Sequence, residues 1–284
     1  MRNSLLLVVL LSGCTSSSSD DGDHLDIEGK YMLQPGEEKY FCYTARLPAD
    51  RDVAITRMVP DYGVGTHHIL ASQTIANEPE GFSECNTLIR TTWIPLYTGG
   101  LDSGVLQLPP NIGFKPFERG QQILMQLHLQ NATDAPISAK TSMRFEFVDQ
   151  SPEIQPASIY GMDNRKISVA PQSQATTEMS CIASKDLQVF AVLGHMHKQG
   201  LKLDVSRGAV AGADMLYEED WKFEEQPVTP LAMQVKKGDN LHLRCTHKNT
   251  TNNPVVYGES SDNEMCSFVL FYAPATTLDG CINE

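Results

Sequence analysis

The chain has 284 residues, of which 41% are hydrophobic, and a formal net charge of −13 at pH 7. That length suits one large or two medium domains. The acidic balance argues against nucleic acid as a partner, because neutralising phosphates requires clustered Lys and Arg side chains.

The first residues are typical of an export signal. Residues 1–3 are a short basic start, and the apolar run 5–11 is too short to span a bilayer. The run ends in Leu11-Ser12-Gly13-Cys14, which resembles a bacterial lipobox. We therefore expect a lipoprotein signal peptide over 1–13, cleaved before a lipidated Cys14. An ordinary signal peptide with a chance cysteine is the alternative.

Residues 14–25 are rich in Ser and Asp and are predicted to form a flexible tether. No later segment is apolar enough for a membrane helix, so the lipid on Cys14 is the only expected membrane attachment. Cys14 is followed by Thr15 and not by an aspartate, which in Gram-negative sorting resembles a signal for the outer membrane. The sequence thus predicts an exported bacterial lipoprotein, in the outer membrane if the source is Gram-negative.

The cysteine count indicates an oxidising compartment. Six of the seven cysteines remain once Cys14 is set aside, and an even number predicts three disulfides, with fifteen pairings open. Free thiols or a zinc site are the alternative, but no CxxC occurs. The six are Cys42, Cys85, Cys181, Cys245, Cys266 and Cys281.

Short alternating runs broken by Pro, Gly, Asn and Asp predict an all-β fold of antiparallel β-sandwich or jelly-roll type. No amphipathic helix longer than about three turns is evident. Asp149-Gln150-Ser151-Pro152 interrupts the pattern, so we place an N-terminal domain over 26–150 and a C-terminal domain over 151–284. The predicted strands cover 40–47, 53–58, 122–129, 141–148, 189–193, 201–205, 241–245 and 267–272.

Five of the eight histidines fall into three settings. His67 and His68 are adjacent, and neighbouring strand residues point to opposite faces. Both can reach one metal only at a strand end or with one imidazole turned. His128 shares a strand face with Gln126, and a lone strand histidine is more often a satisfied polar residue than a ligand.

His195 and His197 make a stronger pattern. Positions i and i+2 share a strand face about 6–7 Å apart, so two imidazoles can converge on one ion; a surface strand is the alternative. Gly194 and Gly200 flank the pair and indicate close packing or a turn. Met265 is a core methionine by default, and its thioether matters as a ligand only for copper, since soft sulfur favours Cu(I).

In combination, these motifs resemble the copper type II, ascorbate-dependent monooxygenases, the family of peptidylglycine α-hydroxylating monooxygenase and dopamine β-monooxygenase. The resemblance covers roughly residues 25 to 284. It is carried, in chain order, by Tyr40-Phe41-Cys42 with Arg46-Leu47-Pro48, Gly65-Thr66-His67-His68, Gln126-x-His128, His195-x-His197 and Ser260-Ser261-Asp262-Asn263-Glu264-Met265-Cys266.

The resemblance implies two copper ions, one in each of two tandem β-sandwich domains that face each other across an open cleft. His67, His68 and His128 match the electron-transfer copper of the N-terminal domain. The catalytic copper, which binds and activates O₂, matches His195, His197 and Met265. Gln126 matches a family glutamine linked to electron passage, with a plain polar strand residue as the alternative. Family position also implies the disulfides Cys42–Cys85, Cys181–Cys281 and Cys245–Cys266.

Three positions depart from the peptide-hydroxylating members of the family. Where those have an arginine, an asparagine and a tyrosine around substrate, this chain has Leu193, Ser267 and Val269. Strand alternation places Leu193 on the face of His195, and Ser267 and Val269 on the face of Met265. The expected pocket is therefore more apolar and lacks a carboxylate clamp. We expect a small neutral, lipophilic or aromatic substrate rather than a peptidylglycine.

The sequence thus predicts a monomeric copper monooxygenase that hydroxylates a C–H bond with O₂ and ascorbate or another reductant. One alternative is a periplasmic protein that binds and sequesters copper without turnover. A zinc hydrolase or structural sandwich is the other, and it leaves Met265 and the first histidine trio unexplained. His24, His242 and His247 match no ligand position in the family, and we expect them at the surface.

Overall fold

The computed structural model describes residues 23–85, 90–100, 103–275 and 279–283. These residues form strands and loops without a helix, so the predicted all-β class is confirmed. Within them there is accordingly no helix with the length and apolarity needed to cross a membrane. The expected signal peptide and Cys14 lie outside the described residues.

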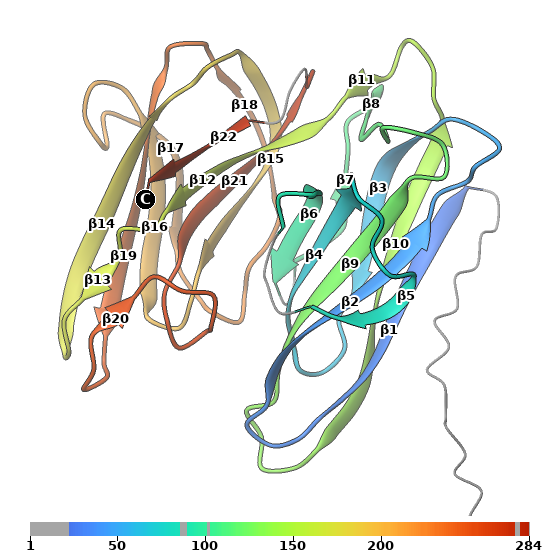
Figure 1. Ribbon diagram of the computed structural model, residues 1–284. Coiled ribbons are helices and arrows are strands. Elements are labelled where there is room, and N and C mark those ends of the chain that lie inside the picture. The colour runs from blue at the N-terminus through green and yellow to red at the C-terminus, as the bar shows by residue number, and fades with distance from the viewer. Residues whose placement is uncertain (1–22, 86–89, 101–102, 276–278, 284) are drawn as a thin grey trace, which may run out of the picture.

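The first half of the chain forms two sheets, whose strands all lie between His24 and Asp149 (Figure 1). Their inward faces share one apolar cluster, which makes this half a sandwich. One sheet has the order β1 (His24–Leu33), β10 (Ile137–Asp149), β3 (Val53–Asp61), β7 (Leu106–Gln107). The other has the order β5 (Gly81–Glu84), β2 (Glu38–Arg46), β9 (Gln122–Gln130), β4 (Thr66–Thr74), β6 (Trp93–Gly100).

The second half repeats this architecture around its own apolar cluster. One sheet has the order β18 (Thr229–Val235), β15 (Leu187–Met196), β21 (Cys266–Ala273), β12 (Ser158–Asn164), β22 (Asp279–Asn283). The other has the order β14 (Ser173–Ile182), β19 (Asn240–Asn249), β16 (Gly200–Arg207), β17 (Asp214–Asp220). The short pairs are β13 (Ser168–Val169) with β20 (Val255–Val256), and β11 (Gln155–Pro156) with β8 (Ile112–Gly113).

The two halves pack against each other through β15 and β21. Ala191, Leu193 and Phe271 are at most 3% exposed and belong to the same apolar cluster as the core of the first half. Val192 and Met196, on the opposite face of β15, belong to the core of the second half. One sheet therefore separates the two cores, and the face that carries Leu193 is turned toward the first half.

All eight strands predicted from alternation are present, most of them longer at one or both ends. The flexible tether predicted over 14–25 is wrong at its end, because β1 begins at His24. His24 pairs with Glu146 on β10, and Leu25 is 1% exposed. Alternating apolar residues from Leu25 to Leu33 face the core, which explains why this stretch is a strand.

The three disulfides implied by family position are confirmed. Cys42 is bonded to Cys85 in the first half. The second half contains Cys181–Cys281 and Cys245–Cys266. The last of these joins β19 to the first residue of β21, directly after Met265.

Candidate metal centre

A β-bulge at the start of β4 accounts for the adjacent histidine pair. Thr66 pairs with Leu129 and His68 pairs with His128, so His67 is the extra residue of the bulge. Gly65 has a φ of 87°, in the left-handed region that favours glycine, and a Cβ there would lie 2.4 Å from the Ile137 side chain. The pair thus sits at a strand end, which is one of the two arrangements that let both side chains reach one ion.

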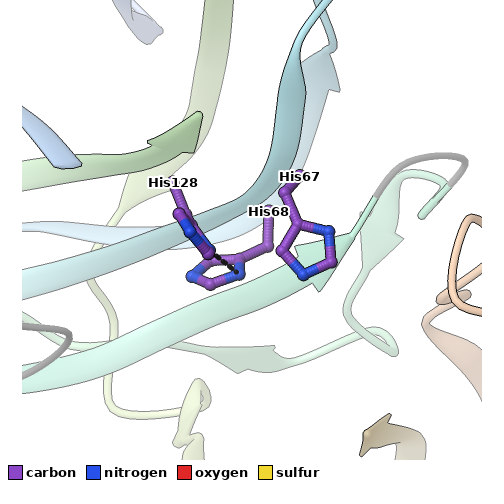
Figure 2. A group of neighbouring side chains, drawn as sticks. All are labelled: His67, His68 and His128. Carbon is purple, nitrogen blue, oxygen red and sulfur yellow. Dashed lines mark hydrogen bonds between the residues drawn. The ribbon is translucent and has the colours of Figure 1, made fainter. Parts of the chain in front are cut away.

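His67, His68 and His128 converge from β4 and β9 (Figure 2). All three are buried, and each offers one nitrogen within 4.8 Å of the other two. The Nδ1 atoms of His68 and His128 are 3.4 Å apart. Two nitrogens about 2 Å from one ion at a tetrahedral angle lie about 3.3 Å apart, so this spacing suits a shared metal.

An unpartnered nitrogen supports the same interpretation. Among the described residues, the buried Nε2 of His67 has no hydrogen-bond partner. A buried polar atom without a partner is rare in folded proteins and calls for an unseen ligand. The trio predicted from the sequence therefore forms a cluster that could bind a metal.

Glu38 and Tyr40 orient His128. The Nε2 of His128 donates to Glu38 Oε1 at 2.7 Å, which leaves Nδ1 to face His68. Tyr40 stacks on the imidazole with a centroid distance of 4.3 Å and an interplanar angle of 11°. The hydrogen bond from His128 lowers the pKa of Glu38 to about 2, so this carboxylate is ionised at neutral pH. Carboxylate partners of this kind fix the tautomer of metal-binding histidines.

His195 and His197 form the second histidine set at the end of β15. Their ring centroids are 5.2 Å apart. The Nδ1 of His195 is 2.8 Å from Gln226 Oε1, and the Nδ1 of His197 is 3.2 Å from the Asn263 carbonyl oxygen. In both rings the Nδ1 is thus occupied, so Nε2 is the atom available to an ion. The Nε2 of His197 is buried and has no partner among the described residues.

Met265 lies beside this second set. It is 3% exposed and immediately precedes β21, where Cys266 pairs with Met196. Continuing that antiparallel register by one residue brings Met265 opposite His197. The backbone N–H of His197 donates to Glu264 Oε2 at 3.0 Å, which ties the two segments together at this point.

The two histidine sets lie next to each other. Ring centroids are 5.9 Å apart for His68 and His195, 6.1 Å for His67 and His197, and 6.5 Å for His67 and His195. The ring of Phe223 lies 4.4 Å from that of His67 and further fills the space. The open cleft expected between the two sites is therefore not seen among the described residues. Apolar packing through β15 and β21 brings the halves together instead.

Burial favours the neutral form of four of the five imidazoles. Desolvation, followed by the nearby His128, lowers the pKa of His67 to about 2, and burial lowers that of His197 to about 3. The same cause holds the pKa of His68 well below its usual range and lowers that of His195. Neutral imidazole is the form that ligates metals, so the cluster is prepared for a cation without losing protons first.

Two acidic side chains beside the rings balance such a cation. Glu38 contacts the first set through His128, and Glu264 contacts the second set through the backbone of His197. Glu264 is fully buried, and its carboxylate also lies 3.3 Å from His247 Nδ1. Neither role could be predicted for these two glutamates, because both contacts join residues that are distant in the chain.

The predicted surface positions of His242 and His247 are wrong. They are 6% and 0% exposed, and His247 faces Glu264 inside the second half. On β19, His247 has the same parity as the buried Leu243 and Cys245, so alternation places it on the core face. His24, by contrast, lies at the start of β1 with its side chain 22% exposed.

A segment without any recognisable motif also contributes to the centre. Trp221 Nε1 donates to the His197 carbonyl oxygen at 3.0 Å. Gln226 binds His195 and contacts the first half at Gly100 and Ser103, whose hydroxyl donates to the Gln226 carbonyl. This segment therefore holds the second histidine set against the edge of the first sandwich.

The predicted substrate-pocket residues lie on one face of the β15–β21–β12 sheet. Leu193 is opposite Val269 and is 1% exposed. His195 is opposite Ser267, whose hydroxyl donates to Asp163 Oδ1 at 2.7 Å. This carboxylate also accepts from Arg165 Nε at 2.8 Å. An ion pair that was not predicted from the sequence therefore lies beside Ser267.

There is open space beside Gly161, on the sheet face that carries the predicted pocket residues. No described heavy atom lies within 4 Å of a Cβ built at Gly161, which pairs with Val269. Tyr160 and Met162, its neighbours on β12, face the core of the second half, so Gly161 faces the same side as Asp163.

Gln126 shares the outer face of β9 with His128, as alternation predicted, while Met125 and Leu127 face the core. It is fully buried, and its side-chain Nε2 lies 3.8 Å from Cys85 Sγ. These contacts place Gln126 beneath the Cys42–Cys85 disulfide.

Comparisons with known proteins point to one family. Residues 156–284 match the family described as copper type II ascorbate-dependent monooxygenase, C-terminal domain. The mouse protein named DBH-like monooxygenase protein 2 is 24% identical over 264 residues, which are 82% of this chain and 40% of that protein. A human relative of the same DBH-like type is 27% identical over 110 residues, which are 37% of this chain and 22% of that protein. The chain thus spans less than half the length of these relatives.

Solved structures add little. The crystal structure of the STIV MCP aligns over 88% of this chain and 97% of its own, with 8% identity and a TM-score of 0.36, a likeness too weak to bear on function. The second half of the chain thus resembles the C-terminal domain of the copper type II ascorbate-dependent monooxygenases, and both relatives carry the DBH-like monooxygenase name.

Proposed function

We propose that the chain is a copper-dependent monooxygenase that hydroxylates a C–H bond of a small organic substrate. The observation that carries this proposal is the cluster of five imidazoles, four of them buried and four with a lowered pKa, in which the Nε2 atoms of His67 and His197 lack a hydrogen-bond partner among the described residues. Copper and ascorbate dependence are implied by the family match.

The donor sets suit two different tasks. His67, His68 and His128 form an all-nitrogen site, which fits an ion that stores and passes one electron. His195 and His197 with Met265 add a soft thioether, which favours Cu(I), the form that meets O₂. When bound, copper supplies the one-electron chemistry that reduces O₂ and breaks the C–H bond.

The overall reaction is balanced by an external reductant. Substrate C–H, O₂, two electrons and two protons give the alcohol and water, and ascorbate or another small reductant supplies the electrons. The chain itself orients ligands through Glu38, Gln226 and the Asn263 carbonyl. It also keeps bulk water out of the cluster, since His67, His68, His128 and His197 are at most 8% exposed.

We infer that the substrate is neutral and largely apolar. Leu193, at the position where the peptide-hydroxylating members have an arginine, is packed in the apolar contact between the halves and offers no charge to a carboxylate. Asp163 and Arg165, which lie beside Ser267, are paired with each other. The space beside Gly161 offers room near Ser267 for a small molecule. A monomeric lipoprotein anchored through Cys14 remains our proposal for its setting, supported by three disulfides that require an oxidising compartment.

The decisive experiment is an untargeted search for oxygenated products. The disulfide-intact protein, loaded with copper, is incubated with ascorbate, a library of neutral compounds and ¹⁸O₂. We expect a product that carries one ¹⁸O atom. Consumption of ascorbate and O₂ without such a product would favour a copper-sequestering protein, because loosely bound copper alone consumes both.

A further inference from the structure

We propose that Glu38 is a positioning residue that couples the first histidine set to the segment bearing Met265. The same carboxylate fixes His128 and docks residues 259–265, which we call the methionine segment. The docking itself is independent of the proposed function, whereas its consequence for metal binding rests on that function.

Three donors from both halves of the molecule meet at the Glu38 carboxylate. Oε1 accepts from His128 Nε2 at 2.7 Å and from the Ser261 backbone N–H at 3.1 Å. Oε2 accepts from the Ser260 hydroxyl at 3.1 Å. Glu38 is the first residue of β2, more than two hundred residues before these serines, so the contact joins the two sandwiches.

Two neighbouring side chains strengthen the docking. Gln130 Nε2 on β9 donates to the Ser261 hydroxyl at 3.0 Å. The Tyr40 hydroxyl donates to the Glu259 carbonyl oxygen at 3.1 Å, while its ring stacks on His128. The strands that position the first histidine set therefore also hold the start of the methionine segment.

The methionine segment in turn contacts the second histidine set, so its docking on Glu38 also positions His197. Its chain folds back on itself, with the Asn263 N–H bonded to the Ser260 carbonyl oxygen at 2.9 Å. The Asn263 carbonyl oxygen accepts from His197 Nδ1, and Glu264 accepts from the His197 and Gln199 backbone N–H groups. A shift of Ser261 away from Glu38 would therefore disturb both His197 and Met265.

A carboxylate is the group that this arrangement requires. It offers two acceptor oxygens to three donors, and its charge strengthens each of those hydrogen bonds. A glutamine keeps one acceptor oxygen and could donate its NH₂ group to the Ser260 hydroxyl, but it is neutral, so Glu38→Gln loses the charge that strengthens all three hydrogen bonds. Orientation of a ligand histidine by an outer carboxylate typically changes metal affinity 10- to 100-fold.

The docking is tested first on the metal-free, disulfide-intact full chain by hydrogen exchange of peptides covering 259–265. In Glu38→Gln we expect exchange of this segment to be about tenfold faster than in the wild type, with an unchanged melting temperature. Glu37→Gln is the matched control, because the Glu37 carboxylate binds the neighbouring Gln34 and Lys39. It should leave exchange within about twofold of the wild type. Equal exchange in Glu38→Gln and wild type would overturn the docking.

Ser260→Ala keeps the proposal testable if Glu38→Gln does not fold, because it removes a single donor at a part-buried position. It should speed up exchange of the segment by a smaller factor, and unchanged exchange would count against the docking.

The coupling is tested by Cu(I) binding in a His195→Ala/His197→Ala background, where the first set is the remaining site. Competition with a Cu(I) chelator should show about tenfold weaker binding after Glu38→Gln. Cu(I) should also slow exchange of the methionine segment with Glu38 present but not with glutamine there. Unchanged affinity, or slowing that persists in Glu38→Gln, would overturn the coupling. Neither result depends on hydroxylation, so failure of the proposed function is distinguished from failure of this inference.

Discussion

In three of the five imidazoles of the cluster, the two nitrogens have different roles. In His128, His195 and His197, one nitrogen is bonded to Glu38, Gln226 or the Asn263 carbonyl oxygen, which points the other toward the shared interior. Such bonds select a tautomer and limit ring rotation. Met265 has no comparable restraint on its side chain, which has three rotatable bonds, so its position depends on packing and on the backbone around it.

Replacing Met265 with leucine separates its ligand role from its packing role. Leu fills a similar volume, so the free energy of unfolding should change by less than about 1.5 kcal/mol. Loss of the thioether should nevertheless lower product formation at least about tenfold, while His195 and His197 retain most of the copper. Turnover and copper content are measured together. Met162→Leu, at a fully buried methionine on β12, is the control and should leave turnover unchanged. Full product formation by Met265→Leu would show that Met265 is a core residue.

The two faces of β15 belong to different cores, one in each half of the molecule. Leu193 is on the face that packs against the first half, in line with His195 and beside Val269. Its environment in this structure is the interior of an apolar contact rather than the wall of a cleft. A substitution here therefore reports on whether the two halves stay packed.

Leu193→Arg should destabilise the protein rather than create a carboxylate site. A guanidinium at a position that is 1% exposed loses its hydration without gaining a partner, at a cost of about 3 kcal/mol or more. Leu193→Met, which conserves volume, should cost less than about 1.5 kcal/mol. Urea unfolding of the two variants is the measurement. If Leu193→Arg were as stable as Leu193→Met and gained affinity for an acyl-glycine, this face of β15 would have to be open to solvent.

Strand alternation predicted the main strands of the fold and the strand faces of three of the five histidines. It placed His128 and Gln126 on the outer face of β9, and His195 with His197 at one strand end. Alternation along β19 also places His247 on the core face, so its burial was predictable, although we expected a surface residue. The bulge at His67 could not be predicted, because it is defined by pairing with a strand about sixty residues away.

The partners of the histidines were beyond sequence reasoning for the same reason. Glu38, Gln226 and Asp163 lie in unremarkable contexts, and their roles arise only when distant strands meet. The separation of the two histidine sets is likewise a property of how the sandwiches pack. The family resemblance implied the ligand sets, but the open cleft that came with it does not describe this arrangement.

The whole molecule concentrates neutral histidines at the boundary between its halves, and acid should therefore destabilise it. Each imidazole with a lowered pKa takes up a proton more readily in the unfolded chain. Its contribution is thus intact above pH 6.5 and is lost as the pH falls below it, toward the folded values of about 2 for His67 and about 3 for His197. The free energy of unfolding should fall by up to about 1.4 kcal/mol per pH unit for each such histidine.

Urea unfolding of the metal-free protein between pH 7.5 and 5.0 measures this slope. Carboxylates titrate mainly below that window, where the pKa of Glu38, lowered to about 2, adds a further loss in stronger acid. His67→Gln/His197→Gln should show a shallower pH dependence than the wild type, because two titrating groups are removed. Parallel curves for the two proteins would mean that these imidazoles are not kept neutral by burial.

The same concentration of histidines raises the question of whether the molecule holds one ion or two. The centroid of an imidazole lies about 3.2 Å from an ion bound to its nitrogen, so two ligands at a tetrahedral angle have centroids about 5.2 Å apart. Centroid distances within each set run from 4.8 to 5.3 Å. The three between the sets that are closest, His68 to His195, His67 to His197 and His67 to His195, run from 5.9 to 6.5 Å and would need angles of about 135° or more at a shared ion, well above the tetrahedral value.

We therefore expect two copper ions per chain. Metal analysis of the copper-loaded, disulfide-intact protein after dialysis should give a ratio near two. His67→Ala/His68→Ala and His195→Ala/His197→Ala should each lower it to near one, because each pair of substitutions removes one donor set while the other remains. A wild-type ratio near one that either double substitution reduces to near zero would instead indicate a single ion shared across the boundary. In that case the electron-storing and O₂-binding tasks could not be divided between two sites.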